Sequence, residues 1–152
     1  HPTGFLGEDS RVAPTNLVPI LCEVALGKRE TFHVFGTDYN TPDGTCIRDY
    51  IHVCDLARAH VQSLLFEQTN AVEIFNLGVG RGFSVKEILD TFQKVIGRTI
   101  SITYGPRRIG DIPAIWAVSE RARVLLNWTC LFGAEQALEH AWQWVSKKNL
   151  ES

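Results

Sequence analysis

Apolar segments of two different periods alternate along this chain, and this alternation restricts the fold more than any other feature of the sequence. Residues 31–36 (TFHVFG), 73–78 (EIFNLG) and 99–104 (TISITY) are short, rich in β-branched or aromatic residues, and end at or just before a glycine. Elsewhere, apolar residues recur every three or four positions, as on one side of a helix. Strands that alternate with helices are typical of α/β proteins. We therefore expect residues 1–152 to form one mixed α/β domain.

Capping residues mark where the helices begin and end. Asn16 and Asp55 are favoured N-cap residues before apolar stretches of helical spacing, and Ser84 with Glu87 has the pattern of a capping box. Gly97 is a natural helix end. We expect helices at 17–27, 55–67, 84–97, 119–126 and 133–148, the second with apolar residues along one side.

Composition and charge exclude several kinds of partner. The net charge of −2 gives no electrostatic attraction for nucleic acid or an anionic membrane surface. No apolar run approaches the roughly 18 residues that span a bilayer. The chain opens on HPTGFLGED, without an initiator Met or a secretion leader, which indicates a piece of a longer protein. The four cysteines lack C-x-x-C or zinc-finger spacing, so we expect reduced thiols in a cytoplasmic protein.

Three patterns imitate sites of chemistry. The glycine cluster NLGVGRGFS (76–84) has G-x-G-x-G spacing, with Phe83 at the place of the third glycine of a dinucleotide fingerprint, and this favours a tight turn beside a ligand. Tyr104 and Arg108 have the spacing of the dehydrogenase pattern Y-x-x-x-K, but an arginine stays protonated and cannot replace the lysine, so the pattern itself is absent. His52 lies near Asp49 and Asp55, but no metal-ligand spacing is present, and we expect a structural role for all three. We therefore predict no catalytic, cofactor-binding or metal-binding residue in this chain.

The arginines are a better signal for a ligand. Arg48 follows a glycine-containing turn in a long loop, and Arg107 and Arg108 follow Gly105-Pro106 in a second loop. The planar guanidinium group suits phosphate oxygens. Asp111 could accept from ribose or sugar hydroxyls, or orient the arginine. Residue types alone leave two interpretations open, an anion-binding site and a pair of solvated loops with ordinary ion pairs.

Longer motifs give the chain a resemblance to a known family. The resemblance rests on four stretches of sequence. Three are HPTGFLGED (1–9), IFNLGVGRGFSV and PRRIGDIPAIWA, and the fourth is the block Y-x-T-x-D-G-T-x-x-R-D-Y-I-H-V-x-D-L-A-x-x-H (39–60). The chain resembles the C-terminal half of the UDP-glucose (UDP-galactose) 4-epimerases, which are extended short-chain dehydrogenase/reductases. The resemblance extends from His1 to about residue 144.

The resemblance implies a small mixed α/β substrate-binding domain at 1–152, without the N-terminal Rossmann domain. In the family, that missing half binds NAD and carries the catalytic Tyr/Lys pair, and the full-length enzyme interconverts UDP-glucose and UDP-galactose by transient oxidation at sugar C4. The implied partners are these UDP-sugars, the protein's own N-terminal domain and a second subunit in a homodimer. The present chain alone should be inactive.

The resemblance also implies a set of substrate-binding residues. Asn16, Arg48 and Arg108 match positions at the diphosphate, and Asp111 matches a carboxylate near the ribose. The stretch His33-Val34-Phe35 matches the segment that contacts uracil through backbone groups and a ring, and Val85 lines the nucleoside pocket. Ile115 matches a position beside the sugar C2 substituent where some members have Tyr and others Cys. This difference bears on whether UDP-N-acetylhexosamines are also substrates.

Two other interpretations remain open. The chain could belong to a different nucleotide-sugar enzyme, a dehydratase or a decarboxylase. It could also be a non-catalytic module that binds sugar nucleotides. A G-x-x-G-x-x-G loop and a Y-x-x-x-K motif upstream of His1 would identify half of an enzyme.

Overall fold

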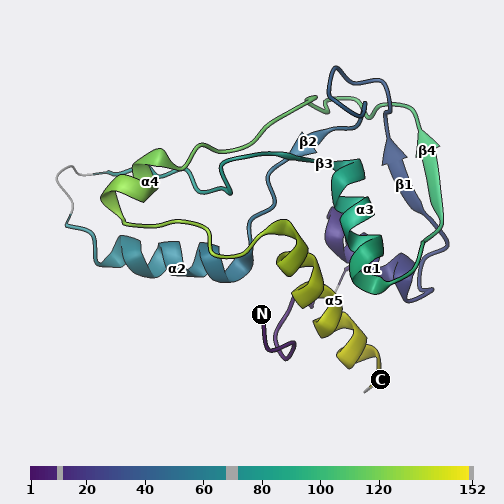
Figure 1. Ribbon diagram of the computed structural model, residues 1–152, viewed down its shortest axis with the longest axis horizontal. Coiled ribbons are helices and arrows are strands. Elements are labelled where there is room, and N and C mark those ends of the chain that lie inside the picture. Colours follow the sequence, from purple (N-terminus) through teal and green to yellow (C-terminus); the bar gives the residue numbers. More distant parts are fainter. Residues whose placement is uncertain (10–11, 68–71, 151–152) are drawn as a thin grey trace.

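The computed structural model describes residues 1–9, 12–67 and 72–150, which form an elongated mixed α/β fold with two packed regions (Figure 1). The elements in chain order are α1 (Leu17–Ala25), β1 (Phe32–Phe35), β2 (Ile47–Arg48), α2 (Val53–Leu64), β3 (Phe83–Ser84), α3 (Val85–Ile96), β4 (Ile102–Gly105), α4 (Glu120–Leu125) and α5 (Ala134–Leu150). Strand β1 pairs in parallel with β4, and β2 pairs antiparallel with β3. The α/β class expected from the sequence is confirmed.

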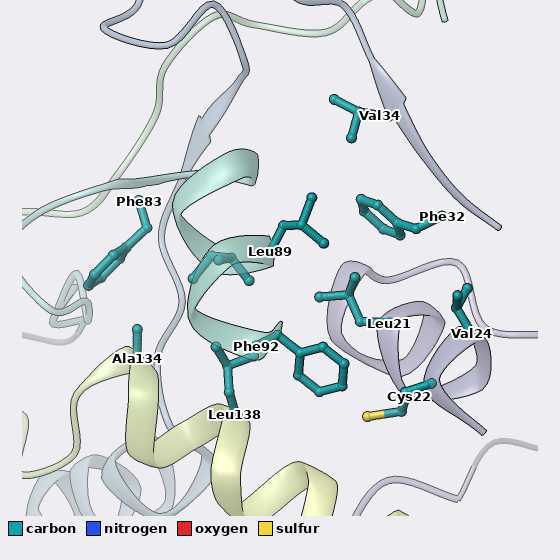
Figure 2. Packing of buried hydrophobic residues seen from close by; sticks show 12 residues of the cluster. Leu21, Cys22, Val24, Phe32, Val34, Phe83, Leu89, Phe92, Ala134 and Leu138 are labelled. Carbon is teal, nitrogen blue, oxygen red and sulfur yellow. The ribbon is translucent and has the colours of Figure 1, made fainter. Parts of the chain in front are cut away.

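The larger packed region lies between α1, α3, α5 and β1. Phe92 of α3 and Leu21 of α1 are fully buried, and Figure 2 shows both side chains directed into the same interior, with Leu89 and Phe32 beside them. Trp142 of α5 meets the Phe92 ring edge to face, at 6.0 Å between centroids. Full burial of a Leu or Phe side chain contributes about 1.5–3 kcal/mol. This region therefore fixes β1, which contains the expected site residues His33, Val34 and Phe35.

The smaller packed region lies between α2, α4 and the segments that flank them. Trp128 is 1% exposed and packs with Ala59, Ala122 and Leu126. Its indole Nε1 donates to the backbone carbonyl oxygen of Asp55 at 2.9 Å, so the polar end of the buried ring is satisfied. The two regions have separate apolar clusters. The short strands β2 and β3 lie beside the start of α3 (Figure 1), and Phe83 of β3 belongs to the larger cluster.

The ends of α3 follow the sequence prediction, whereas the start of α2 does not. Ser84 and Glu87 form the expected capping box, and Gly97 ends α3 in the left-handed conformation. The prediction that Asp55 caps the second helix is wrong: α2 begins at Val53, and the His52 ring accepts from the Cys54 amide at 3.0 Å. Asp55 lies in the first turn with a fully buried carboxylate.

A long-range contact explains the different role of Asp55. Its carboxylate oxygens accept from the backbone amides of Leu131 and Phe132 at 3.0–3.1 Å. Arg58 lies 3.2 Å from the same carboxylate. A buried charge is tolerated when it is paired and hydrogen-bonded, and this one fixes the chain before α5 against α2.

Residues 73–78 are extended, but they pair with no strand in the described part of the chain, so the prediction of a strand there is wrong for this structure. Ile74 is 74% exposed, while Phe75 packs in the smaller region against Phe66. A β-rich pattern becomes a strand only when a neighbouring strand satisfies its backbone groups. The apolar side predicted for the second helix is likewise solvent-exposed, at Val61, Leu64 and Leu65.

An aromatic and histidine contact joins α2 to α5. The His52 ring stacks on Phe132 at 4.3 Å between centroids, and His52 Nε2 lies 3.1 Å from His140 Nδ1. Because His52 Nδ1 accepts from the Cys54 amide, the proton of the neutral ring is on Nε2, which donates to His140. Burial and the neighbouring His140 lower the pKa of His52 below its ordinary value of 6.5.

We expect the free energy of unfolding to fall as the pH falls below about 6.5, because the unfolded chain then takes up a proton that folded His52 resists. Protonated His52 also cannot accept from the Cys54 amide. The variant His52→Asn keeps a capping side chain that does not titrate. Urea unfolding between about pH 7.5 and pH 5.5 should show a smaller loss of stability in the variant than in the wild type. Equal losses in both proteins would contradict this role of His52.

Candidate functional site

The outer edge of β1 offers unpaired backbone groups and an aromatic surface. The amides of Phe32 and Gly36 donate toward β4, so the backbone groups of the alternate residues His33 and Phe35 face the opposite edge. No strand of the described chain pairs with that edge. The side chains of His33 and Phe35 are exposed, with ring centroids 6.2 Å apart, whereas the side chain of Val34 is buried and its backbone groups face β4. The prediction that Val34 contributes backbone groups to a ligand is therefore not supported by its orientation in β1. A flat, hydrogen-bonding ring would suit this edge.

Two arginines converge beside this edge on one carboxylate. Arg108 Nε lies 3.0 Å from Asp111 Oδ2, and Arg48 Nη2 lies 3.7 Å from Asp111 Oδ1. The Arg108 guanidinium also lies 5.0 Å from the centroid of the Phe35 ring. Two positive groups sharing one negative partner leave an excess positive charge, which favours an anionic ligand. Four of the predicted site residues are therefore brought together by direct contacts.

The position of Arg48 differs from the prediction. It lies in β2, opposite Phe83 of β3, and not on a loop. Its Nη1 donates to the carbonyl oxygens of Ile47 and Ile112 at 2.8 and 2.7 Å. These contacts leave part of the guanidinium for a ligand and hold the side chain in one orientation. The loop prediction failed because a two-residue strand is created by its partner rather than by its own sequence.

The segment 112–117 lies alongside β2 and presents Ile115 to solvent. The Ile47 amide donates to the Pro113 carbonyl oxygen at 2.8 Å, and the Ile115 amide donates to the Ile47 carbonyl oxygen at 3.1 Å. The Ile115 side chain is 53% exposed. Backbone pairing thus places Ile115 next to the residue that precedes Arg48.

Asn16 and Val85 lie apart from this set of contacts. Asn16 is the N-cap residue of α1, and its exposed side chain makes no capping hydrogen bond. Val85 begins α3, its amide donates to the Cys46 carbonyl oxygen at 2.9 Å, and its side chain packs against the larger core. In the described residues, no hydrogen bond or ion pair joins either of them to the arginines. Their assignment to a ligand stays a prediction.

The loop after β1 contributes residues that the sequence did not single out. Arg107 lies over the Tyr39 ring at 4.4 Å, and its Nε donates to Asp38 Oδ1 at 2.8 Å. The hydrogen bond from Arg107 lowers the pKa of Asp38. Asp43 accepts from Thr45 and from Ser84, the N-cap of α3. The only sequence signal for these contacts was the abundance of polar and turn-forming residues in the loop.

Two of the three glycines of the cluster 76–84 lie directly against protein atoms, which does not suit a phosphate cradle. A Cβ built on Gly78 would lie 2.1 Å from Asp49 Oδ2, and one built on Gly82 would lie 2.2 Å from the Ile47 side chain. The Asp49 carboxylate would also repel a phosphate at this place. The interpretation as a tight turn is therefore favoured, although no strand precedes it. Within the described ranges, no group of three or more His, Cys, Asp or Glu residues is placed to hold a metal ion.

The chain is similar in sequence and in fold to known proteins. A model of the NAD dependent epimerase/dehydratase family matches residues 3–78. UDP-glucose 4-epimerase 4 of Oryza sativa subsp. japonica is 44% identical over 149 residues, which are 97% of this chain and 40% of that protein. The crystal structure of UDP-glucose 4-epimerase from Bifidobacterium longum, in complex with NAD+ and UDP, has a TM-score of 0.93 at 39% identity, covering 98% of this chain and 44% of that one. The UDP-Glc/GlcNAc 4-epimerase of Campylobacter jejuni has a TM-score of 0.79 at 36% identity, covering 90% and 43%.

The fold and the site define an α/β protein in which two arginines lie near a free strand edge. The chain belongs to the NAD dependent epimerase/dehydratase family, and the resemblance to UDP-glucose 4-epimerases is confirmed. It spans about 40–44% of the length of the relatives named above. No helix in the described part of the chain is both long and apolar enough to cross a bilayer.

Gly36 sets the turn between β1 and the loop of Tyr39, and its replacement should be costly. Its φ of 79° favours glycine, and a Cβ there would lie 2.3 Å from the Tyr39 ring. Gly97 has a φ of 69° but open space around its Cβ position. We expect Gly36→Ala to lower the free energy of unfolding by at least about 1 kcal/mol more than Gly97→Ala, since only the first adds a clash to the backbone strain. Urea unfolding of both variants measures the difference, and equal losses would show that the Tyr39 ring adapts.

Proposed function

We propose that this chain is the UDP-sugar-binding portion of a UDP-glucose 4-epimerase, and that the full-length protein interconverts UDP-glucose and UDP-galactose. The observation that carries the proposal is the convergence of Arg48 and Arg108 on Asp111, beside the free edge of β1. Similarity to UDP-glucose 4-epimerases over 97% of the chain supports it.

In this proposal the chain holds the nucleotide end of the substrate. The uracil lies against the outer edge of His33-Val34-Phe35 and the Phe35 ring, near Val85. Arg48, Arg108 and Asn16 contact the diphosphate, and Asp111 contacts the ribose. The contacts of the two arginines with Asp111 keep the guanidinium groups oriented, which reduces the cost of ordering them on binding.

The reaction itself requires the other half of the protein. The N-terminal half would hold NAD, which would supply reversible hydride chemistry at sugar C4, while a base of that half would take up and return the proton of the C4 hydroxyl. The hexose must turn between these steps, so this chain must hold UDP firmly and the hexose loosely. Because the chain contains no Y-x-x-x-K pair and its glycine turn is filled by Asp49 and Ile47, we propose that it neither binds NAD nor epimerises alone.

An exposed apolar surface supports the N-terminal Rossmann domain as a partner. Leu64 and Leu65 are at least 80% exposed, and Val72, Ile74 and Val118 are 68–75% exposed. Large apolar side chains that are exposed to this extent indicate a candidate interface. We propose that the N-terminal half covers it, and that the full-length protein forms a homodimer in the cytoplasm. The four free cysteines suit a reducing compartment.

We expect Arg48→Ala or Arg108→Ala to weaken UDP binding by the full-length protein about ten- to a hundredfold, because hydrogen bonds to charged groups contribute roughly 1.5–3 kcal/mol. Arg123→Ala is the matched control, since Arg123 pairs only locally, with Glu120 at 2.5 Å on the surface of α4. Calorimetry gives the three affinities. Unchanged UDP affinity in both site variants would contradict the assignment of the diphosphate contacts.

Ile115 is the proposed determinant of sugar range. Its side chain is half exposed, and it lies within the segment 112–117 that pairs with β2. In the family, this position lies beside the C2 substituent of the sugar. Ile leaves more room than Tyr for an N-acetyl group, although it is stiff at χ1 and offers no hydrogen-bond partner. We propose that the enzyme acts best on UDP-glucose and UDP-galactose and also acts, more slowly, on the UDP-N-acetylhexosamines. The similarity to a UDP-Glc/GlcNAc 4-epimerase supports this range.

We expect Ile115→Tyr to abolish activity on UDP-N-acetylglucosamine while sparing activity on UDP-glucose, because the ring would occupy the space of the acetamido group. The measurement is kcat/KM for both substrates in the wild-type and variant full-length proteins. Wild-type protein without any turnover of UDP-N-acetylglucosamine would disprove the wider sugar range, but not the epimerase assignment.

A further inference from the structure

Asp49 holds two separate segments with one carboxylate. Its Oδ2 accepts from the Ala117 amide at 2.9 Å, and its Oδ1 accepts from the Val79 amide at 3.3 Å. The first amide belongs to the segment that presents Ile115, and the second belongs to the glycine turn. Asp49 directly follows Arg48, so it ties both segments to the end of β2.

The carboxylate continues a backbone pairing that would otherwise stop. Ile47 pairs in parallel with Ala114, and its amide and carbonyl bond to Pro113 and Ile115. In a regular parallel ladder, the amide of residue 117 would next donate to the backbone carbonyl of residue 49. Here the side chain of Asp49 accepts that hydrogen bond instead. Ile115 is therefore fixed on both sides, by Ile47 at its own amide and by Asp49 two residues further on.

The surroundings are shaped to admit this carboxylate. A Cβ on Gly78 would lie 2.1 Å from Asp49 Oδ2, so only glycine leaves room for the contact. The Gly78 carbonyl oxygen accepts from Ser119 Oγ at 2.9 Å, just beyond the segment 112–117. The Trp116 ring packs closely on Gly82, since a Cβ built on that glycine would lie 3.0 Å from the Trp116 ring atom Cε3. The glycine turn and the Ile115 segment thus form one unit around Asp49.

We propose that Asp49 is a positioning residue that sets the sugar specificity by fixing residues 115–117. The proposal rests on the proposed function, in which Ile115 borders the hexose. Loss of the Asp49 contacts frees the Ala117 amide and lets the Ile115 backbone move away from β2. The pocket then accepts a larger C2 substituent more easily, while the contacts of Arg108 with the nucleotide are unaffected.

The test is the ratio of kcat/KM for UDP-N-acetylgalactosamine to kcat/KM for UDP-galactose in the full-length protein. This ratio does not depend on the amount of folded enzyme, so a role in stability alone would leave it unchanged. Asp49→Asn keeps the size of the side chain but retains one acceptor oxygen for two amides. We expect the ratio to rise about fivefold or more, within the range that small changes in pocket contacts produce. Asp90→Asn, on an exposed ion pair of α3 with Lys86, is the control and should leave the ratio unchanged.

A second variant makes the test independent of how well Asp49→Asn folds. Ala117→Pro leaves Asp49 in place and removes the N–H that donates to Asp49 Oδ2, although proline also restricts φ at residue 117, and it should raise the ratio in the same direction. Amide hydrogen exchange should also become faster at Val79 in Asp49→Asn than in the wild type. A ratio within about twofold of the wild-type value in both variants would overturn the role of Asp49. Wild-type protein that turns over neither sugar would instead contradict the proposed function.

Discussion

The pairing of residues 47–49 with residues 112–117 is the interaction on which the candidate site depends. It combines two backbone hydrogen bonds at Ile47 with side-chain hydrogen bonds from Arg48 and to Asp49. Each of these bonds satisfies a backbone group on a segment with little regular structure of its own. Without the pairing, the loop of Arg108 and Asp111 would have no fixed position relative to Arg48, and the two guanidinium groups would not meet at one carboxylate.

The two packed regions differ in how fully their apolar side chains are enclosed by the rest of the chain. The larger region is enclosed by three helices and β1, and it fixes the strand whose edge faces the arginines. The smaller region buries Trp128 but leaves the apolar side of α2 in solvent. The contact between them includes the His52, His140 and Phe132 rings, and burial lowers the pKa of His52. The region with the exposed apolar side chains is therefore joined to the larger region through a contact that includes His52.

Local sequence signals predicted the structure well where both partners of an interaction lie within a few residues. The capping box of α3 is an example, since Ser84 and Glu87 need only each other and the first helical turn. Asp55 shows the opposite case. An aspartate before an apolar stretch is a good N-cap by local rules, but the fold brings the amides of Leu131 and Phe132 to its carboxylate, and His52 takes the cap. Residues 73–78 fail similarly, because a strand requires a neighbour that the local pattern cannot supply.

The sequence by itself determined the α/β class, most helix positions and the residue types of the site, because periodicity, capping and the long motif at 39–60 are properties of adjacent residues. It also singled out Arg48, Arg108 and Asp111 as candidates for an anionic ligand. Only the tertiary structure decided that both arginines share Asp111, that Arg48 lies in a strand, and that Asp49 takes the place of a backbone carbonyl beside Ala117. The physical reason is that a charged side chain bonds to whichever partner the fold brings within about 3 Å, and no local pattern encodes a partner far along the chain.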